Sequence, residues 1–371
     1  MKTKSLLLAF AGLGLFACSN EEFNENGVNG EANVSVRIDE PTLSRAIDAG
    51  NFTNSTAVTL NSIKLVLTAQ TGSAEKTFNL NDEGIGGDRA KLLEEVNKFQ
   101  FLKVRNPSKM EVFINTVKSS GWTLADVVNT ELAEPLYASS KTFVDKGDTD
   151  DDNINEYQVD LTPAHTVARL ELGGIEHIHS KVEGTEDEKP CMFKTINIDG
   201  IFLNKVAGTT AATDWATAQT NTPVHSVIGT SEKPVSFVTG QKWPADGKCY
   251  GYNILPVTSG NLPVLTVCFS NITIDTEKYD GVVWGNEDGF GYATVKNYKL
   301  DAASASHKEA FGAGDDNIIK KFPAGYIYQV KSLQIPDEAI GTTIDGGKDV
   351  HVYAVVTVNP WTIATGTVEW N

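Results

Sequence analysis

The stretch that decides the fold is Asn33-Val34-Ser35-Val36-Arg37-Ile38, near the start of the chain. Valine and isoleucine alternate in it with polar side chains, so that one face is apolar and the other polar. Successive side chains of a β-strand point to opposite faces of its sheet. This period of two is therefore typical of a half-buried strand.

The same alternation recurs along the chain, in short runs that are separated by Gly, Pro, Asn and Asp. These residues favour turns. The further runs are 63–67, 112–114, 193–203, 265–269, 326–330 and 352–358. Many short strands with turn signals between them predict an all-β fold made of β-sandwich domains. Apolar residues at three-to-four spacing predict two helical insertions, Asp88–Phe99 and Thr123–Leu132.

A chain of 371 residues with 40% hydrophobic residues exceeds what one core usually supports, and two domains are expected. The polar stretch 145–156, followed by Thr162-Pro163, marks the junction. We therefore expect an N-terminal sandwich over 46–163 and a C-terminal sandwich over 164–371.

Acidic residues in the junction alternate as in a calcium-binding EF-hand loop, at Asp148, Asp150 and Asp152. The glycine at the sixth position is missing, and Val159 stands where the bidentate glutamate should be. A solvated loop is favoured over a calcium site.

The first residues have the features of an export signal. Lys2 and Lys4 precede the apolar run 6–16, which is too short for a permanent membrane span, so residues 1–17 are expected to be a signal peptide. The run ends in Leu15-Phe16-Ala17-Cys18, which resembles a lipobox, and we predict that Cys18 carries the lipid anchor. The alternative is a cysteine that merely follows an ordinary signal peptide. The next residues, Ser19-Asn20-Glu21-Glu22, resemble the surface-export signal of Bacteroidetes lipoproteins.

The other reactive side chains do not indicate a catalytic, metal or cofactor site. The sequence lacks a Gly-x-Ser-x-Gly elbow, a His-Glu-x-x-His motif and a P-loop. His177 and His179 have no cysteine or acidic partner at ligand spacing and are predicted to be solvated loop histidines. The three remaining cysteines are expected to be buried, with one disulfide at most: Cys191, Cys249 and Cys268.

Net charge excludes one class of partner. The formal charge of −17 would repel phosphate backbones, so nucleic acid is not an expected partner.

Several motifs, spread over nearly the whole chain, together resemble the FimA-like fimbrillins of Bacteroidetes. They are the Cys18 lipobox, the strand 33–38, Leu43-Ser44-Arg45-Ala46, Val167-Ala168-Arg169-Leu170-Glu171-Leu172, Tyr252-Asn253-Ile254-Leu255-Pro256, Gly325-Tyr326-Ile327-Tyr328-Gln329-Val330 and Val356-Thr357-Val358-Asn359-Pro360-Trp361. The resemblance implies two transthyretin-like β-sandwich domains and a non-enzymatic subunit of a surface fimbria that serves adhesion and colonisation.

The resemblance also implies a processing step and an assembly step. An Arg-specific protease would cut between Arg45 and Ala46 and remove the propeptide 18–45 with its strand. Pro41 and the polar residues around it favour an exposed loop there. A C-terminal donor strand that includes Val352 and Ala354 would then fill the vacated groove of the next subunit.

The implied partners are other fimbrial subunits, both copies of this chain and accessory pilins, together with the protease. Before cleavage the precursor would be held on the outer membrane by its lipid, and afterwards the subunit would lie in the surface fimbria.

Three alternatives stay open at this stage. A surface lipoprotein that binds glycans would use exposed aromatic platforms, for which Trp215, Trp243 and Trp284 are available, although packing roles are favoured for them. A secreted glycoside hydrolase would hide its paired carboxylates among the 48 acidic residues. In the third alternative, residues 352–358 serve only as the last strand of their own sandwich.

Overall fold

The computed structural model describes residues 30–38, 60–81, 99–130, 133–148, 153–222, 224–244, 248–285, 289–302, 304–344 and 352–360 of the chain. The predicted signal peptide, Cys18, the Arg45-Ala46 bond and residues 361–371 lie outside this part. So do Asp150, Asp152 and all but Phe99 of the first predicted helix.

The strands in chain order are β1 (Glu31–Ile38), β2 (Ser62–Ala69), β3 (Gly72–Asn79), β4 (Gln100–Arg105), β5 (Pro107–Ile114), β6 (Leu136–Ser140), β7 (Val144–Gly147), β8 (Asn155–Leu161), β9 (Ala168–Leu172), β10 (Ile175–Ile178), β11 (Phe193–Asn204), β12 (His225–Val227), β13 (Val235–Ser236), β14 (Lys242–Trp243), β15 (Tyr250–Ile254), β16 (Val264–Ile274), β17 (Gly291–Leu300), β18 (Tyr326–Pro336) and β19 (Val352–Pro360). The helices are α2 (Leu124–Val127), α3 (Trp215–Asn221) and the 3-10 turns η1 (Ala305–His307) and η2 (Asp337–Ala339). The predicted all-β fold with minor helices is confirmed.

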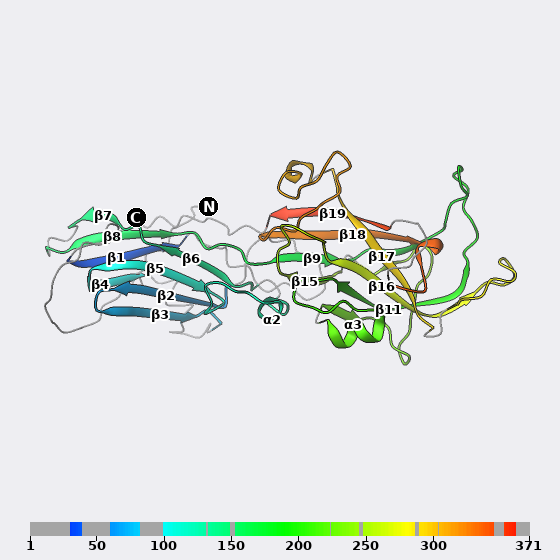
Figure 1. The fold of residues 1–371 in the computed structure, drawn as a ribbon, viewed down its shortest axis with the longest axis horizontal. Helices are drawn as coiled ribbons and strands as arrows, with labels where there is room; N and C mark the ends of the chain where they lie inside the picture. Colours follow the sequence, from blue (N-terminus) through cyan, green and yellow to red (C-terminus); the bar gives the residue numbers. More distant parts are fainter. Residues whose placement is uncertain are drawn as a thin grey trace.

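Strands β1 to β8 form two four-stranded sheets, ordered β4-β1-β8-β7 and β3-β2-β5-β6. Their alternating sequences place apolar side chains on the inner faces. Val34 and Val36 of one sheet and Leu65 and Leu67 of the other are fully buried in one hydrophobic core. The two sheets therefore pack face to face, and they form the left part of the molecule in Figure 1.

Strands β9 to β19 join in one larger sheet, along the path β12-β11-β16-β17-β19-β18-β10-β14, with β9, β13 and β15 attached beside it. They form the right part of the molecule, so the two groups of strands lie end to end (Figure 1). The last strand of the first group ends at Leu161 and the first strand of the second group begins at Ala168.

The second predicted helix is shorter than its apolar spacing suggested. Helix α2 spans four residues, of which Leu124 and Val127 are buried, and a turn follows at 128–129. The Thr130 hydroxyl donates to the carbonyl of Val127 at 2.8 Å and closes that turn. Helix α3 was not predicted. Its N-cap, Asp214, accepts a hydrogen bond from the backbone N–H of Thr217 at 2.7 Å.

None of the helices in the described part of the chain is long and apolar enough to cross a membrane.

Candidate functional site

Strand β1, which the proposed cleavage would remove, is an internal strand of its sheet. It runs antiparallel to β4, with Val34 opposite Phe101, and parallel to β8, with Val36 opposite Val159. Both of its edges are therefore paired with neighbouring strands (Figure 1). Loss of β1 would leave unpaired backbone groups on β4 and on β8.

The inward face of β1 supplies part of the hydrophobic core. Ala32, Val34 and Val36 are completely buried, and Ile38 is nearly so. Burying one valine contributes roughly 1.5–3 kcal/mol, so the two valines together contribute about 3–6 kcal/mol. The gap that β1 would leave is apolar on its floor as well as polar along its edges.

One polar side chain fixes the register of β1. Asn33 is buried, and its Nδ2 donates to Glu156 Oε1 of β8 at 2.9 Å. Its Oδ1 accepts the backbone N–H of Lys103 of β4 at 2.9 Å. A slip by one residue would break both bonds and turn the valines outward.

Strand β19, which contains the predicted donor residues Val352 and Ala354, is also an internal strand. It runs parallel to β17, with Val352 opposite Val295, and antiparallel to β18, with Val358 opposite Tyr328. In this unassembled chain β19 is thus part of the sheet of its own half.

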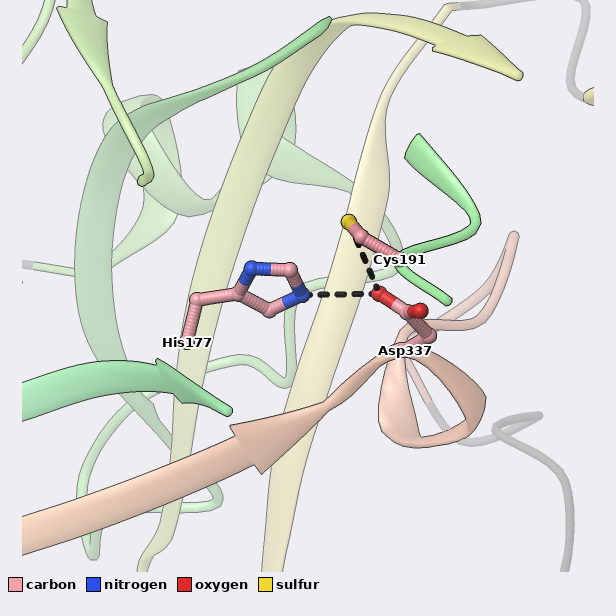
Figure 2. A group of neighbouring side chains, drawn as sticks. All are labelled: His177, Cys191 and Asp337. Atoms are coloured by element: carbon pink, nitrogen blue, oxygen red, sulfur yellow. Dashed lines mark hydrogen bonds and ion pairs between the residues drawn. The ribbon is translucent and has the colours of Figure 1, made fainter. Parts of the chain in front are cut away.

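The structure corrects the prediction for His177 and His179. His177 is 1% exposed and belongs to β10, and His179 is half-buried, with an Nδ1 that has no hydrogen-bond partner. His177 also has the cysteine and acidic partners that its sequence neighbourhood lacks. Its imidazole, the Cys191 thiol and the Asp337 carboxylate point toward one another from three separate segments (Figure 2). One ligand atom from each lies within 4.8 Å of the other two.

The contacts in this cluster are short and directional. His177 Nε2 lies 2.7 Å from Asp337 Oδ1, and the Cys191 thiol donates to the same oxygen at 3.8 Å. On the outer side, His177 Nδ1 lies 2.9 Å from the hydroxyl of Thr239. Asp337 Oδ2 accepts the backbone N–H of Met192 at 2.7 Å. The Cys191 thiol also lies 3.3 Å from the carbonyl oxygen of Phe193, so two acceptors compete for its one proton. Nε2, Sγ and Oδ1 face one another on the inner side of the cluster.

Burial raises the pKa values of the three cysteine thiols in the described part of the chain. It raises the pKa of Cys191, and the nearby Asp337 carboxylate adds to this effect. Burial raises the pKa of Cys249 to about 12 and that of Cys268 well above its usual value. All three are free thiols, and the prediction of buried cysteines is confirmed for Cys249 and Cys268, whereas Cys191 is half-buried.

Tryptophan side chains singled out in the sequence have packing roles. Trp215 is 4% exposed and lies 5.9 Å from the ring of Phe202. Trp243 stacks on Tyr250 at 5.0 Å, and Trp284 meets Phe193 edge to face at 5.9 Å. These three residues do not form an exposed aromatic platform.

A buried carboxylate that the sequence analysis missed lies where the two halves meet. Glu134 is completely buried, and its Oε2 accepts the backbone N–H groups of Thr166 and Val167 at 3.1 and 3.2 Å. Its Oε1 also contacts His165 Nδ1. Burial raises the pKa of Glu134. This side chain holds the end of the N-terminal half against the segment that enters β9.

No family model matches the chain, and no curated protein matches it in sequence. Solved structures resemble it in fold. A "putative cell adhesion protein" from Parabacteroides distasonis is 11% identical, with a TM-score of 0.46 over 90% of this chain and 100% of that chain. Another from Bacteroides eggerthii is 12% identical, with a TM-score of 0.44 over 90% and 97%. A fimbrial assembly protein from Parabacteroides distasonis is 10% identical, with a TM-score of 0.28 over 85% and 94%.

Proposed function

We propose that this chain is a non-enzymatic structural subunit of a surface fimbria. It is exported as a lipoprotein on Cys18, cleaved between Arg45 and Ala46, and polymerised by donor-strand exchange. The host surface serves as the target of the assembled fibre.

The observation that carries the proposal is that β1 and β19 have equivalent surroundings. Each is an internal strand with one parallel and one antiparallel neighbour, β8 and β4 for β1 and β17 and β18 for β19. Their lengths are eight and nine residues. A strand that left the position of β19 and entered the position of β1 would meet neighbours of the same two directions.

The groove that remains after cleavage supplies the driving force. Unpaired N–H and C=O groups on β4 and β8 each cost about 1–3 kcal/mol when they stay buried, and the apolar floor adds the hydrophobic term. A β-rich strand from another chain would restore both interactions. Segment 352–358 consists of β-formers apart from Ala354.

The geometry of this exchange leads to a filament. The donor strand lies at one end of the sequence and the groove in the other half of the molecule, so the contact is head-to-tail. Such a contact does not close on itself unless its rotation happens to form a ring. Successive subunits would therefore extend a fibre.

A cleavage experiment tests the proposal. The full chain is treated with an Arg-specific protease, then imaged by electron microscopy and sequenced from its new N-terminus. We expect filaments whose subunits begin at Ala46, and no filaments from the Arg45→Ala variant. Filaments from uncleaved chains, or cleaved chains that remain monomeric, would contradict donor-strand exchange.

Removal of the C-terminal tail tests the donor. In this proposal the donor strand continues from β19 into residues 362–371, so deletion of these residues should leave a folded, cleavable monomer whose shortened donor cannot extend a filament. Normal filaments from this variant would place the donor strand elsewhere.

Lipid anchoring has its own test. We expect Cys18→Ser to release the protein from the membrane, because each buried methylene of a lipid chain contributes roughly 0.8 kcal/mol to membrane binding. Metabolic labelling with a fatty acid should mark the parent protein and not the variant. A parent protein without label would overturn the lipoprotein assignment.

A further inference from the structure

We propose that His177, Cys191 and Asp337 form a binding site for a divalent transition metal, with zinc as the best-suited ion. The inference is independent of fimbrial assembly, because it rests on side chains outside β1 and β19.

The three residues have the ligand chemistry that zinc prefers. Imidazole nitrogen, thiolate sulfur and carboxylate oxygen are its usual protein ligands, and three such ligands leave a fourth position for water. Among the described residues, this is the one place where three His, Cys, Asp or Glu ligand atoms come together.

The distances suit one ion after a small movement. Zinc bonds of about 2.0–2.3 Å in tetrahedral geometry place neighbouring ligand atoms about 3.3–3.6 Å apart. Cys191 Sγ and Asp337 Oδ1 are 3.8 Å apart, close to this value. His177 Nε2 and Asp337 Oδ1 are 2.7 Å apart, so they must separate by about half an ångström or slightly more. Asp337 lies in the short turn η2, where its side chain can make that adjustment.

The surrounding contacts already orient the ligands. With a metal on Nε2, the remaining imidazole proton lies on Nδ1 and donates to the Thr239 hydroxyl, which is 2.9 Å away. Thr239 is held there by backbone pairing, since the N–H of Gly240 donates to the carbonyl of His177 at 2.9 Å. The second oxygen of Asp337 is occupied by the N–H of Met192. Outer partners of this kind are typical of protein metal sites.

Charge balance favours a dication. Metal binding would release one proton, from the Cys191 thiol to solvent, and the resulting thiolate and the Asp337 carboxylate would neutralise the two positive charges. Because a proton and the metal compete for the same sulfur, binding should weaken as the pH falls.

The site would tie together the far end of the C-terminal half. His177 lies near the end of β10, Cys191 just before β11 and Asp337 just after β18, in η2. Residues 178–190 project between the first two ligands, and Lys181 pairs with Glu188 within this loop. A bound metal would fix the base of the loop.

Cobalt titration tests the site, with Co²⁺ as the spectroscopic probe for zinc. The full chain carrying Cys18→Ser, so that the predicted lipidation thiol is absent, is stripped with a chelator under reducing conditions and titrated. We expect one equivalent of cobalt to bind, with a thiolate-to-cobalt charge-transfer absorption that zinc abolishes. The absorption should persist in Cys249→Ala, the matched control from the same half of the molecule, and disappear in Cys191→Ala.

Thermal unfolding provides a second readout that also reports folding. Zinc should raise the Tm of the parent and of Cys249→Ala but not that of Cys191→Ala or Asp337→Asn. Thr239→Val, which removes the outer partner of His177 and a side-chain contact of Cys191, should weaken zinc binding about 10- to 100-fold.

Either of two results would overturn the proposal. A folded parent protein that shows neither the cobalt absorption nor a zinc-dependent Tm would identify the cluster as a hydrogen-bonded clamp alone. An absorption retained in Cys191→Ala would place the metal on another thiol.

Discussion

Truncation of Val36 to alanine should weaken the uncleaved precursor and leave the assembled filament unchanged. Val36 is completely buried in β1, which the proposed cleavage would remove before assembly. Its two lost methyl groups correspond to about 1.6 kcal/mol of burial free energy. The cavity left behind, at about 24 cal/mol per Å³, raises the expected loss of unfolding free energy to about 2–3 kcal/mol.

The matched variant is Val159→Ala on β8. Val159 is equally buried and lies directly opposite Val36 in the parallel register, but it stays in the mature subunit. This variant should weaken both the precursor and the filament. Val144→Ala, at a valine that is 43% exposed, controls for the substitution itself and should change stability by no more than about 0.5 kcal/mol.

Precursor stability is measured by urea unfolding, followed by circular dichroism. With a slope of about 1–3 kcal/mol per molar urea, a loss of 2–3 kcal/mol lowers the midpoint of the affected transition by about 1 M. Filament stability is measured as the temperature at which filaments dissociate to monomers in detergent on a gel.

Two outcomes would refute the reasoning. Filaments of Val36→Ala that dissociate as early as those of Val159→Ala would show that β1 remains in the fibre. A precursor with Val36→Ala and an unchanged urea midpoint would show that β1 is not part of the stable core.

Three further predictions follow from other parts of the structure. Gly174→Ala should destabilise the chain by about 3 kcal/mol or more in thermal unfolding, because Gly174 has φ +62° and a Cβ there would lie 2.0 Å from a backbone carbonyl oxygen. The control Gly285→Ala, with open space around its Cβ, should be nearly neutral in the same assay. At pH 8, native protein without metal should be alkylated first at Cys191, whereas Cys249, whose pKa is raised to about 12, should react only after unfolding. Peptide mass spectrometry measures the alkylation rate of each cysteine, and equal rates would contradict the burial pattern. Glu134→Ala should cost about 3 kcal/mol, since it leaves two backbone N–H groups without their acceptor, while Glu134→Gln should cost less in urea unfolding.

Strand β1 was predicted from its alternation, and residues 35–38 indeed alternate between half-buried and buried. In β16 and β18, residues 265–269 and 327–330 are buried on both faces, so these strands were recognised by dense runs of β-forming residues rather than by a polar face. Strand β3 was missed because it is mostly exposed at a sheet edge and its sequence, Gly-Ser-Ala-Glu-Lys-Thr-Phe-Asn, is polar. The helix predicted over Thr123–Leu132 is longer than α2, because apolar spacing does not show where a turn ends a helix.

The His177 cluster could not be predicted from spacing. Its members are brought together by the parallel pairing of β10 with β18, which places His177 opposite Ile335 and so brings it near Asp337. This pairing joins residues that lie 160 positions apart. A search for ligands at helical or hairpin spacing cannot find such a contact. Thr239, which contacts the other nitrogen of His177, comes from yet another segment of the chain.

The parallel pairing of β1 with β8 has a consequence for the order of folding. Ala32 pairs with Asn155, so β1 cannot complete its pairing until most of the N-terminal half is present. The hairpins β2–β3 and β7–β8 close over short separations and should form earlier, since closing a long loop costs more chain entropy. We expect pulsed hydrogen exchange during refolding to protect β1 amides after those of β2 and β3, and earlier protection of β1 would contradict this order. A strand that joins last can depart without dismantling the hairpins that formed before it.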